Sequence, residues 1–250
     1  MGDGTILLDV DGVSKSFGDL RAVDQVSFQV AEGQIFGIAG PNGSGKSTLF
    51  NIVTGIPFRP DSGTVRFAGR EIQGLRGHEI ARAGLARTFQ RETSFDSLSV
   101  FENALLGVTY GLGRRTAAAR RDAVAEALAF TGFAEADFDL PAAALSVYQR
   151  KCLMLASALA MQPRMLLLDE PASSLTKPEI ETTITLIRQI AARGVTILLI
   201  EHVLALLLTL SEHLLVLNQG QILAEGTPDA VVKNPHVIEA YLGRRKQAAA

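Results

Sequence analysis

Residues 40–47 read GPNGSGKS, and their types and spacing point most directly to chemistry. The pattern fits G-x4-G-K-[ST], in which glycines let backbone N–H groups converge on phosphate oxygens and the following helix start adds partial positive charge. We expect Lys46 to reach the β- and γ-phosphates of ATP and the Ser47 hydroxyl to complete a Mg²⁺ shell. The predicted nucleotide-binding residues are Gly40, Pro41, Asn42, Gly43, Ser44, Gly45, Lys46, Ser47 and Thr48.

The same stretch could be a plain glycine turn between two elements. Against that alternative, the compact apolar run IFGIA precedes it as a strand, and STLFNIVTG follows as a helix. A strand, this loop and a helix are the context that confirms a phosphate loop. Nucleotide binding is therefore the preferred interpretation.

A second acidic stretch, MLLLDEP at residues 165–171, completes the case for hydrolysis. A buried strand ending in Asp169 can hold Mg²⁺ through its bound water, and the adjacent Glu170 can orient or activate an attacking water. Such a strand ending is common by itself. Paired with the phosphate loop, it predicts an ATP hydrolase rather than a simple binder.

The elements that position these residues alternate in kind along the chain. Residues 5–36 read as short antiparallel strands with turns at 18–19 and 32–33, and residues 78–160 as helical segments. The last third returns to strands and helices, including a helix after a Thr176–Glu179 capping box with Ile180, Ile184, Ile187 and Ala191 on one face. This order predicts an α/β fold with a parallel sheet and an inserted helical part.

Composition narrows the class of protein further. The chain has 250 residues, 47% hydrophobic and 20% charged, and a formal net charge of −2, so a dedicated nucleic-acid binder is disfavoured. Cys152 is the only cysteine, which excludes an internal disulfide and fits a reducing compartment. The longest apolar run is six residues, 203–208, far below the roughly 20 needed to cross a bilayer.

Four more segments then fall into a recognisable order. Gln90 ends GLARTFQ, residues 145–149 read LSVYQ, SSLT follows the acidic pair at 173–176, and His202 follows the strand VTILLI. The whole chain resembles the ATP-binding cassette (ABC) ATPases in this order of phosphate loop, Q-loop, signature, acidic strand, D-loop and switch histidine. The resemblance implies a P-loop NTPase core at 5–90 and 160–250, with an N-terminal antiparallel β subdomain and a helical signature subdomain at 91–159.

The resemblance also implies roles for individual residues. Phe17 would stack on adenine, where a base–aromatic contact contributes about 1–3 kcal/mol, with core packing as the alternative. Gln90 would contact Mg²⁺ and the water, so that Ser47, Gln90 and Asp169 would form the metal site. His202 would contact the γ-phosphate. The signature Leu145, Ser146, Val147, Tyr148 and Gln149 would act on the nucleotide of a second ATPase subunit.

Finer features resemble one subfamily. GLARTFQ, LSVFENALLG, VLNQGQILAEGTP and NPHVIEAYLG look like the longer, first ATPase type of branched-chain amino acid importers. Relatives with these features also serve urea and amides. The resemblance implies a second ATPase subunit, two transmembrane permease subunits and an extracytoplasmic solute-binding protein. It places the chain peripherally at the cytoplasmic face of the inner membrane.

Tyr148 departs from the family signature L-S-x-G-Q, and Ser157 stands where the family usually carries arginine. A phenol would either fill the space of the phosphate or force the backbone away, whereas glycine permits close approach. Because the phosphate-loop side is complete, we expect an asymmetric heterodimer in which the partner supplies an intact signature. The alternative is that the loop tolerates Tyr148.

Rival functions of other classes remain open at this point. A soluble ABC protein acting on ribosomes or DNA is disfavoured by the single cassette. A regulatory clamp that binds ATP with little hydrolysis is disfavoured by Glu170 and His202 but favoured by Tyr148 and Ser157. An exporter ATPase for lipid or polysaccharide stays possible within the ABC class.

Overall fold

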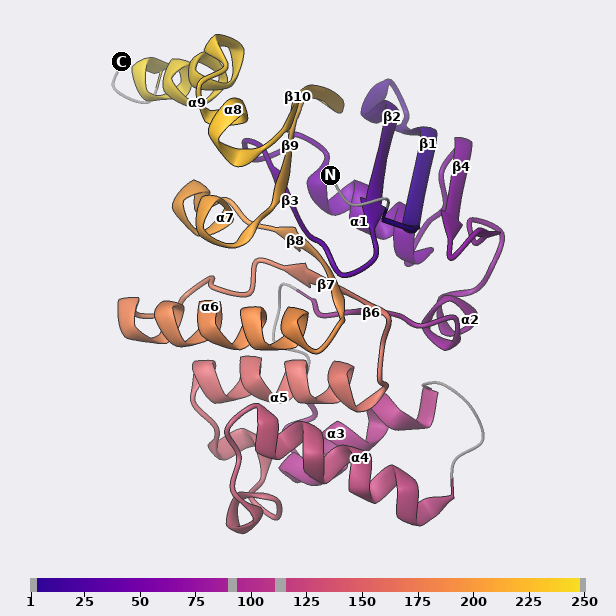
Figure 1. Ribbon diagram of the computed structural model, residues 1–250, viewed down its shortest axis with the longest axis vertical. Coiled ribbons are helices and arrows are strands. Elements are labelled where there is room, and N and C mark those ends of the chain that lie inside the picture. Colours follow the sequence, from indigo (N-terminus) through magenta and orange to yellow (C-terminus); the bar gives the residue numbers. More distant parts are fainter. Residues whose placement is uncertain (1–3, 90–93, 111–115, 248–250) are drawn as a thin grey trace. The chain divides into compact units, whose positions relative to one another are not determined.

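The computed structural model describes residues 4–89, 94–110 and 116–247 (Figure 1). The chain divides into two compact units, and we call residues 1–77 with 196–250 the first unit and residues 78–195 the second unit. This division differs from the predicted one, because it places residues 78–90 and 160–195 with the helical segments. The strand pair β6–β7 accounts for the difference, since it joins these two stretches within one unit.

The first unit opens with an antiparallel sheet in the order β2-β1-β4-β5. Strand β1 (Ile6–Phe17) turns directly into β2 (Leu20–Ala31), and its other edge pairs with β4 (Ser62–Phe67), which pairs with β5 (Arg70–Glu71). Alternating residues of β1 such as Leu8 and Val10 are buried, as a one-sided sheet requires. The predicted N-terminal antiparallel strands are confirmed.

Parallel strands form the other sheet of the first unit. Strand β3 (Ile35–Ala39) lies between β8 (Thr196–Ile200) and β9 (His213–Asn218), parallel to both, and β10 (Gln221–Gly226) closes the edge antiparallel to β9. Every residue of β3 and β8 is buried, which explains their continuous apolar sequences. The helices of this unit are α1 (Lys46–Thr54), α7 (Leu204–Leu210), α8 (Pro228–Val232) and α9 (Pro235–Gln247).

The second unit combines a parallel strand pair with a helical layer. Strand β6 (Leu85–Arg87) pairs with β7 (Met165–Asp169). Its helices are α2 (Gly77–Arg82), α3 (Val100–Tyr110), α4 (Ala117–Phe130), α5 (Val147–Ala160) and α6 (Lys177–Ala192), with short 3₁₀ turns at Glu135–Asp137 and Ala142–Ala144. Helices α3, α4 and α5 lie side by side (Figure 1) around a core that includes Val100, Leu128 and Leu153.

Helix α6 shows where the periodicity argument was imprecise. The predicted face was Ile180, Ile184, Ile187 and Ala191, but the fully buried residues are Thr183, Leu186, Ile187 and Ile190. The two faces share Ile187 and differ by a small rotation of the helix. Thr183 replaces an isoleucine in the buried stripe because its hydroxyl donates to the Glu179 carbonyl at 2.8 Å and needs no water.

The apolar stretch after residue 202 forms a helix that packs one face into the core, followed by a buried strand. Helix α7 buries Leu206, Leu207 and Leu210, and β9 buries residues 214–217. Across the described part of the chain, no helix combines the length and the apolar character that crossing a membrane demands.

Candidate nucleotide site

The phosphate loop lies between β3 and α1 in the first unit. The chain leaves β3 at Ala39 and enters α1 at Lys46, with Gly45 as the N-cap residue at φ 107°. A Cβ atom on Gly45 would lie 2.4 Å from the Ala22 carbonyl oxygen, closer than real contacts allow. Position 45 therefore requires glycine for two reasons: its backbone is left-handed, and the loop backbone passes too close to β2 for a side chain to fit.

Lys46 is held across its own loop. Its ammonium donates hydrogen bonds to the carbonyl oxygens of Gly40 at 2.8 Å and Pro41 at 3.0 Å, and the residue is only 6% exposed. These contacts position the charge beside the start of α1, where N–H groups lack intrahelical acceptors. Together they form a site for an anion with several oxygens.

A cavity of about 530 Å³ opens at this loop. Phe17 lies on its wall with 45% of its surface exposed, and its ring meets Phe58 edge-on at a centroid distance of 5.0 Å. The lining residues are Phe17, Leu20, Arg21, Ala22, Gly43, Gly45, Lys46, Ser47, Thr48 and Gln219. The structure thus brings the predicted aromatic residue and the predicted phosphate loop into one pocket.

Leu20, Arg21, Ala22 and Gln219 were not predicted to belong to this pocket. The first three follow the β1–β2 turn, and Gln219 lies in the β9–β10 turn, so none belongs to a motif with phosphate chemistry. Arg21 offered a usable signal, since a guanidinium four residues after an adenine-stacking candidate could meet a phosphate. Its Nη1 contacts Asp24 at 2.9 Å in this structure.

Gly40 and Ser44 are predicted loop residues that serve the packing of the loop. A Cβ atom on Gly40 would lie 2.3 Å from the Leu217 carbonyl oxygen, and Ser44 is 2% exposed. The Ser44 amide donates to the Pro41 carbonyl at 3.1 Å, and the Ser44 carbonyl accepts from the Gly220 amide at 3.0 Å. These contacts fix the loop against the β9–β10 hairpin.

His202 follows β8 in the first unit, as predicted. Its imidazole is about half exposed, and Nδ1 lies 3.9 Å from Oε2 of Glu201, whose side chain is fully buried. His202 does not line the 530 Å³ cavity. About half of the ring is exposed at the end of β8, where a hydrogen-bonding imidazole could meet a ligand.

The acidic pair lies at the end of β7 in the second unit. Arg87 on the adjacent strand β6 donates from Nη2 to Oδ2 of Asp169 at 2.8 Å, and the two side chains are 8% and 4% exposed. The other carboxylate oxygen, Oδ1, is buried with no hydrogen-bond partner among the described residues. An unmatched buried carboxylate oxygen is suited to a cation or a cation-bound water.

Glu170 adopts a left-handed backbone at φ 50°, a conformation rarely taken by a residue with a side chain. The Lys151 ammonium donates to the Glu170 carbonyl oxygen at 3.4 Å and to the Ser173 hydroxyl at 3.0 Å. Lys151 thereby ties α5 to the turn that carries Glu170. The sequence reasoning missed both Lys151 and Arg87, although Arg87 lies three residues before Gln90 in the same GLARTFQ run.

The predicted signature forms the start of α5. Ser146 is the N-cap residue: its hydroxyl accepts from the Gln149 amide at 3.2 Å, while its own amide donates to Oε1 of Gln149 at 3.0 Å. This reciprocal capping box leaves Val147 and Tyr148 as the first two helical residues, and Val147 is exposed. Their N–H groups have no intrahelical acceptor and can meet an anion.

Tyr148 turns back toward its own unit. Its side chain packs against the helical core, and its hydroxyl hydrogen bonds to the Cys152 sulfur one turn along α5. Burial raises the pKa of Tyr148 to about 12, with the Cys152 contact adding to it. Burial also raises the pKa of the Cys152 thiol, which lies in the helical core as a small apolar side chain. Because Tyr148 is helical, position 148 uses no positive φ here.

Gln90 lies outside the described residues, so the structure does not place the predicted Q-loop contact. Among residues 4–89, 94–110 and 116–247, no three His, Cys, Asp or Glu residues gather into a metal cage. Mg²⁺ needs no such cage, because it is commonly held by one or two carboxylates together with substrate phosphates and water. The Ser47 hydroxyl of the first unit and the Asp169 carboxylate of the second unit are each of a ligand type that Mg²⁺ accepts.

Comparison with known proteins agrees with this geometry. The family model described as "ABC transporter" matches residues 23–173, a stretch that includes the phosphate loop, the signature and the acidic strand. The chain belongs to the ABC transporter family. A second family model, "Branched-chain amino acid ATP-binding cassette transporter", matches residues 221–246, which begin at β10 and include most of α9.

Individual relatives of this ABC cassette are similar over nearly their whole length. It is 39% identical to the high-affinity branched-chain amino acid transport ATP-binding protein BraF of Pseudomonas aeruginosa, over 95% of this chain and 98% of that protein. LivG of Salmonella typhimurium, described in the same words, is 39% identical over the same shares. The Escherichia coli K12 LivG protein is 37% identical.

Solved structures of ABC cassettes superimpose on the chain. An ATP-binding cassette of an ABC transporter in its ADP conformation matches with a TM-score of 0.86 at 31% identity, covering 96% of this chain and 99% of that one. A nucleotide-free cassette matches with a TM-score of 0.87 at 30% identity, covering 95% and 99%. The predicted family, the P-loop NTPase fold of an ABC ATPase and the ATPase class are confirmed.

Proposed function

We propose that this chain is the ATP-hydrolysing subunit of an importer of small polar solutes, with branched-chain amino acids as the substrates. The observation that carries the proposal is the pocket in which Phe17 and an intact phosphate loop meet. The match of the C-terminal residues to the branched-chain amino acid family, and the names of the BraF and LivG relatives, support the substrate.

ATP binding follows from the first unit. We propose that adenine stacks on the exposed face of Phe17, while the loop amides and Lys46 take the phosphates. Ser47, Gln90 and Asp169 would hold Mg²⁺, which neutralises charge on the phosphate oxygens when bound. Glu170 would accept a proton from the attacking water, and His202 would donate a hydrogen bond to the γ-phosphate.

Partners follow from the importer assignment. We propose two transmembrane permease subunits, a second ATPase subunit and an extracytoplasmic solute-binding protein, with this chain at the cytoplasmic face of the inner membrane. The second unit offers a groove of about 200 Å³ for a permease segment. Exposed aromatic rings at Phe89 and Phe95, 40% and 60% exposed, border it and suit an apolar helix.

The second ATPase subunit is proposed to differ from this one. In the proposed dimer, the first turn of α5 would approach the nucleotide of the partner subunit, and Tyr148 stands there where the family carries glycine. Its Cβ adds bulk beside the N–H groups of Val147 and Tyr148, while its ring packs against the helical core. The effect is steric alone, because the Tyr148 backbone is helical. A homodimer would impair both sites by symmetry, so a partner with glycine at this position supports faster turnover at one site.

Steady-state ATPase activity of the purified chain across protein concentration, beside Tyr148→Gly, tests the dimer. We expect the wild type to be nearly inactive alone and the variant to gain turnover that rises with the square of concentration. Wild-type turnover with that same dependence, unchanged by glycine, would contradict the asymmetric dimer. Saturable ATP binding without phosphate release in both proteins would instead favour a regulatory clamp.

Leucine uptake tests the substrate. Liposomes containing the chain with its permeases and second ATPase subunit should accumulate leucine when supplied with ATP inside and the binding protein outside. Urea or an amide in place of leucine serves as the competing solute. Uptake of those solutes without uptake of leucine would overturn the branched-chain amino acid assignment while leaving the importer assignment in place.

A further inference from the structure

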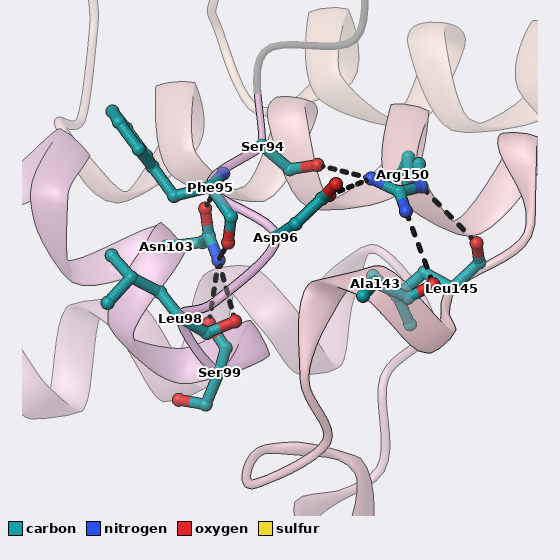
Figure 2. Close-up of polar contacts among 9 residues, drawn as sticks. All are labelled: Ser94, Phe95, Asp96, Leu98, Ser99, Asn103, Ala143, Leu145 and Arg150. Atoms are coloured by element: carbon teal, nitrogen blue, oxygen red, sulfur yellow. Dashed lines mark hydrogen bonds and ion pairs between the residues drawn. The ribbon is translucent and has the colours of Figure 1, made fainter.

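Arg150 binds two separate segments of the second unit with one guanidinium. It donates from Nη1 to the Ser94 hydroxyl at 2.8 Å and to Oδ1 of Asp96 at 2.6 Å. On its other side it donates from Nε to the Leu145 carbonyl and from Nη2 to the Ala143 carbonyl, both at 3.3 Å (Figure 2). The Arg150 side chain is only 18% exposed, although its contact with Asp96 lies open to solvent.

One of these segments carries Phe95 to the border of the groove. Asn103, 6% exposed on α3, donates to the carbonyl oxygens of Phe95 at 3.1 Å, Leu98 at 3.2 Å and Ser99 at 2.9 Å, and accepts from the Phe95 amide at 2.8 Å (Figure 2). The Phe95 backbone is thereby fixed while its ring remains 60% exposed. A force on this ring reaches Ser94 and Asp96 through a stiff backbone.

The other segment leads directly into the signature. Leu145 is 7% exposed in the helical core and immediately precedes the Ser146 N-cap of α5. The Ala143 and Leu145 carbonyls therefore set the direction in which the chain enters the capping box. Displacing them would shift the N–H groups at the start of α5, which are the groups proposed to meet the nucleotide of the partner subunit.

The geometry of the guanidinium makes Arg150 a connector between the two segments. Its three nitrogen atoms lie in one rigid plane, so a displacement of Nη1 also displaces Nε and Nη2. The bonds to Ser94 and Asp96, at 2.8 and 2.6 Å, are shorter than the two bonds of 3.3 Å to the carbonyl oxygens. When the 94–96 segment moves, we therefore expect the guanidinium to move with it.

Asp96 makes the connection adjustable. Its side chain is 66% exposed, so solvent screens the Arg150–Asp96 ion pair and its contribution to stability is small. A partner that moves this segment can alter the pair at little cost. The connection does not serve as a major source of fold stability, which the core around Leu128 and Leu153 supplies.

We propose that Arg150 is a positioning residue that transmits the occupancy of the groove at Phe95 to the N-cap of the signature helix. This inference rests on the proposed function, because a permease segment is what would occupy the groove. Arg150 contacts no nucleotide in this scheme. It sets where the signature N–H groups lie in response to the permease.

Asp96→Asn tests the proposal with the least disturbance, because it keeps the shape of the side chain and removes only the charge. Arg150→Lys keeps the charge and removes the planar fork, since a single ammonium cannot hold both segments in the same way. The matched control is Arg193→Lys, which alters the exposed Arg193–Glu126 pair of 3.3 Å in the same unit. Thermal unfolding of each variant reports whether the fold is retained.

ATPase activity is measured in two preparations, the soluble pair of ATPase subunits and the transporter assembled in liposomes with leucine-loaded binding protein. We expect Asp96→Asn to leave the ATPase activity of the soluble pair unchanged. In the assembled transporter, it should reduce the stimulation of ATPase activity by the permeases and the loaded binding protein by about two- to thirtyfold. Arg150→Lys should reduce that stimulation as well, and Arg193→Lys should not. Stimulation of ATPase activity equal to that of the wild type in both test variants would overturn the inference. A parallel loss of ATPase activity in both preparations would also overturn it, because such a loss indicates a merely structural role.

Leucine transport and the ATPase response of the wild-type assembly distinguish failure of this inference from failure of the proposed function. If the wild-type assembly neither transports leucine nor responds to its permeases, the proposed function fails and the inference fails with it. If the wild type transports and responds, and the variants respond equally, only the role of Arg150 is refuted.

Discussion

Arg87 and Asp169 form a buried ion pair between the neighbouring strands β6 and β7, with Nη2 and Oδ2 2.8 Å apart. Oδ1 of the same carboxylate is buried and has no hydrogen-bond partner among the described residues. The carboxylate can therefore serve two cations at once, the guanidinium on one oxygen and a metal on the other. Arg87 compensates the charge of the buried Asp169 carboxylate.

Removing the guanidinium should destabilise the second unit strongly. Arg87→Met leaves the buried carboxylate without compensation, and we expect the free energy of unfolding to fall by about 3–5 kcal/mol. Urea denaturation measures this loss. Arg193→Met is the control, since the Arg193–Glu126 pair is exposed and should contribute at most about 1 kcal/mol. Equal small losses in both variants would show that solvent reaches Asp169.

A methyl group at position 45 should damage ATP binding. Gly45→Ala combines an unfavourable φ of 107° with a contact of 2.4 Å to the Ala22 carbonyl. Forcing a left-handed conformation costs about 1–2 kcal/mol, so affinity should fall by about tenfold or more if the loop moves to relieve it. Calorimetric titration with ATP measures the affinity.

Gly33→Ala is the matched control for this prediction. Gly33 has a similar φ of 80°, lies in the same unit and has open space where its Cβ would be. It should lose stability without losing ATP affinity. If Gly45→Ala binds ATP as tightly as Gly33→Ala, the close approach to Ala22 is not what shapes the pocket.

The local motifs were predictable because each is contiguous. The phosphate loop and the acidic strand each depend on residues within one short run, and the structure places each on the predicted element. Arg87, Lys151 and Arg150 were not predicted as partners of these motifs. Each connects residues 22 to 82 positions apart, and such contacts depend on strand pairing and helix packing that periodicity cannot give.

The orientation of Tyr148 could not be read from the sequence for the same reason. The substitution itself was visible, and so was the loss of glycine. Its direction depends on Cys152 one turn further along α5 and on the core beneath it. The sequence therefore predicted the site of the departure but not the conformation that accommodates it.

Phe17 should contribute base stacking rather than fold stability. Its ring is 45% exposed and makes a T-shaped contact with Phe58, so much of the ring surface remains open. Phe17→Ala should weaken ATP binding by about 1–3 kcal/mol, whereas Phe17→Tyr keeps an aromatic face and should bind normally. Fluorescence titration with a labelled ATP analogue measures both. A large drop in melting temperature with little change in affinity would assign Phe17 to core packing.

The Tyr148 hydroxyl should ionise at a higher pH than an ordinary tyrosine. Burial raises its pKa to about 12 in the folded chain, against about 10 in an unfolded one. The folded state therefore favours the neutral phenol. Its stabilising contribution is complete below pH 10 and is lost as the pH rises toward about 12. Tyr148→Phe should flatten the pH dependence of the unfolding free energy in that window.

Ultraviolet absorbance of tyrosinate detects the ionisation directly. The sequence has three tyrosines, so the difference between wild type and Tyr148→Phe isolates this one. Cys152→Ala removes the sulfur but leaves the burial, which is the larger cause, and should lower the Tyr148 midpoint only slightly. A wild-type midpoint near the ordinary value would show that the ring lies in solvent. The Tyr148 ring would then lie over the first turn of α5, where the phosphate of the nucleotide bound to the partner subunit is proposed to approach.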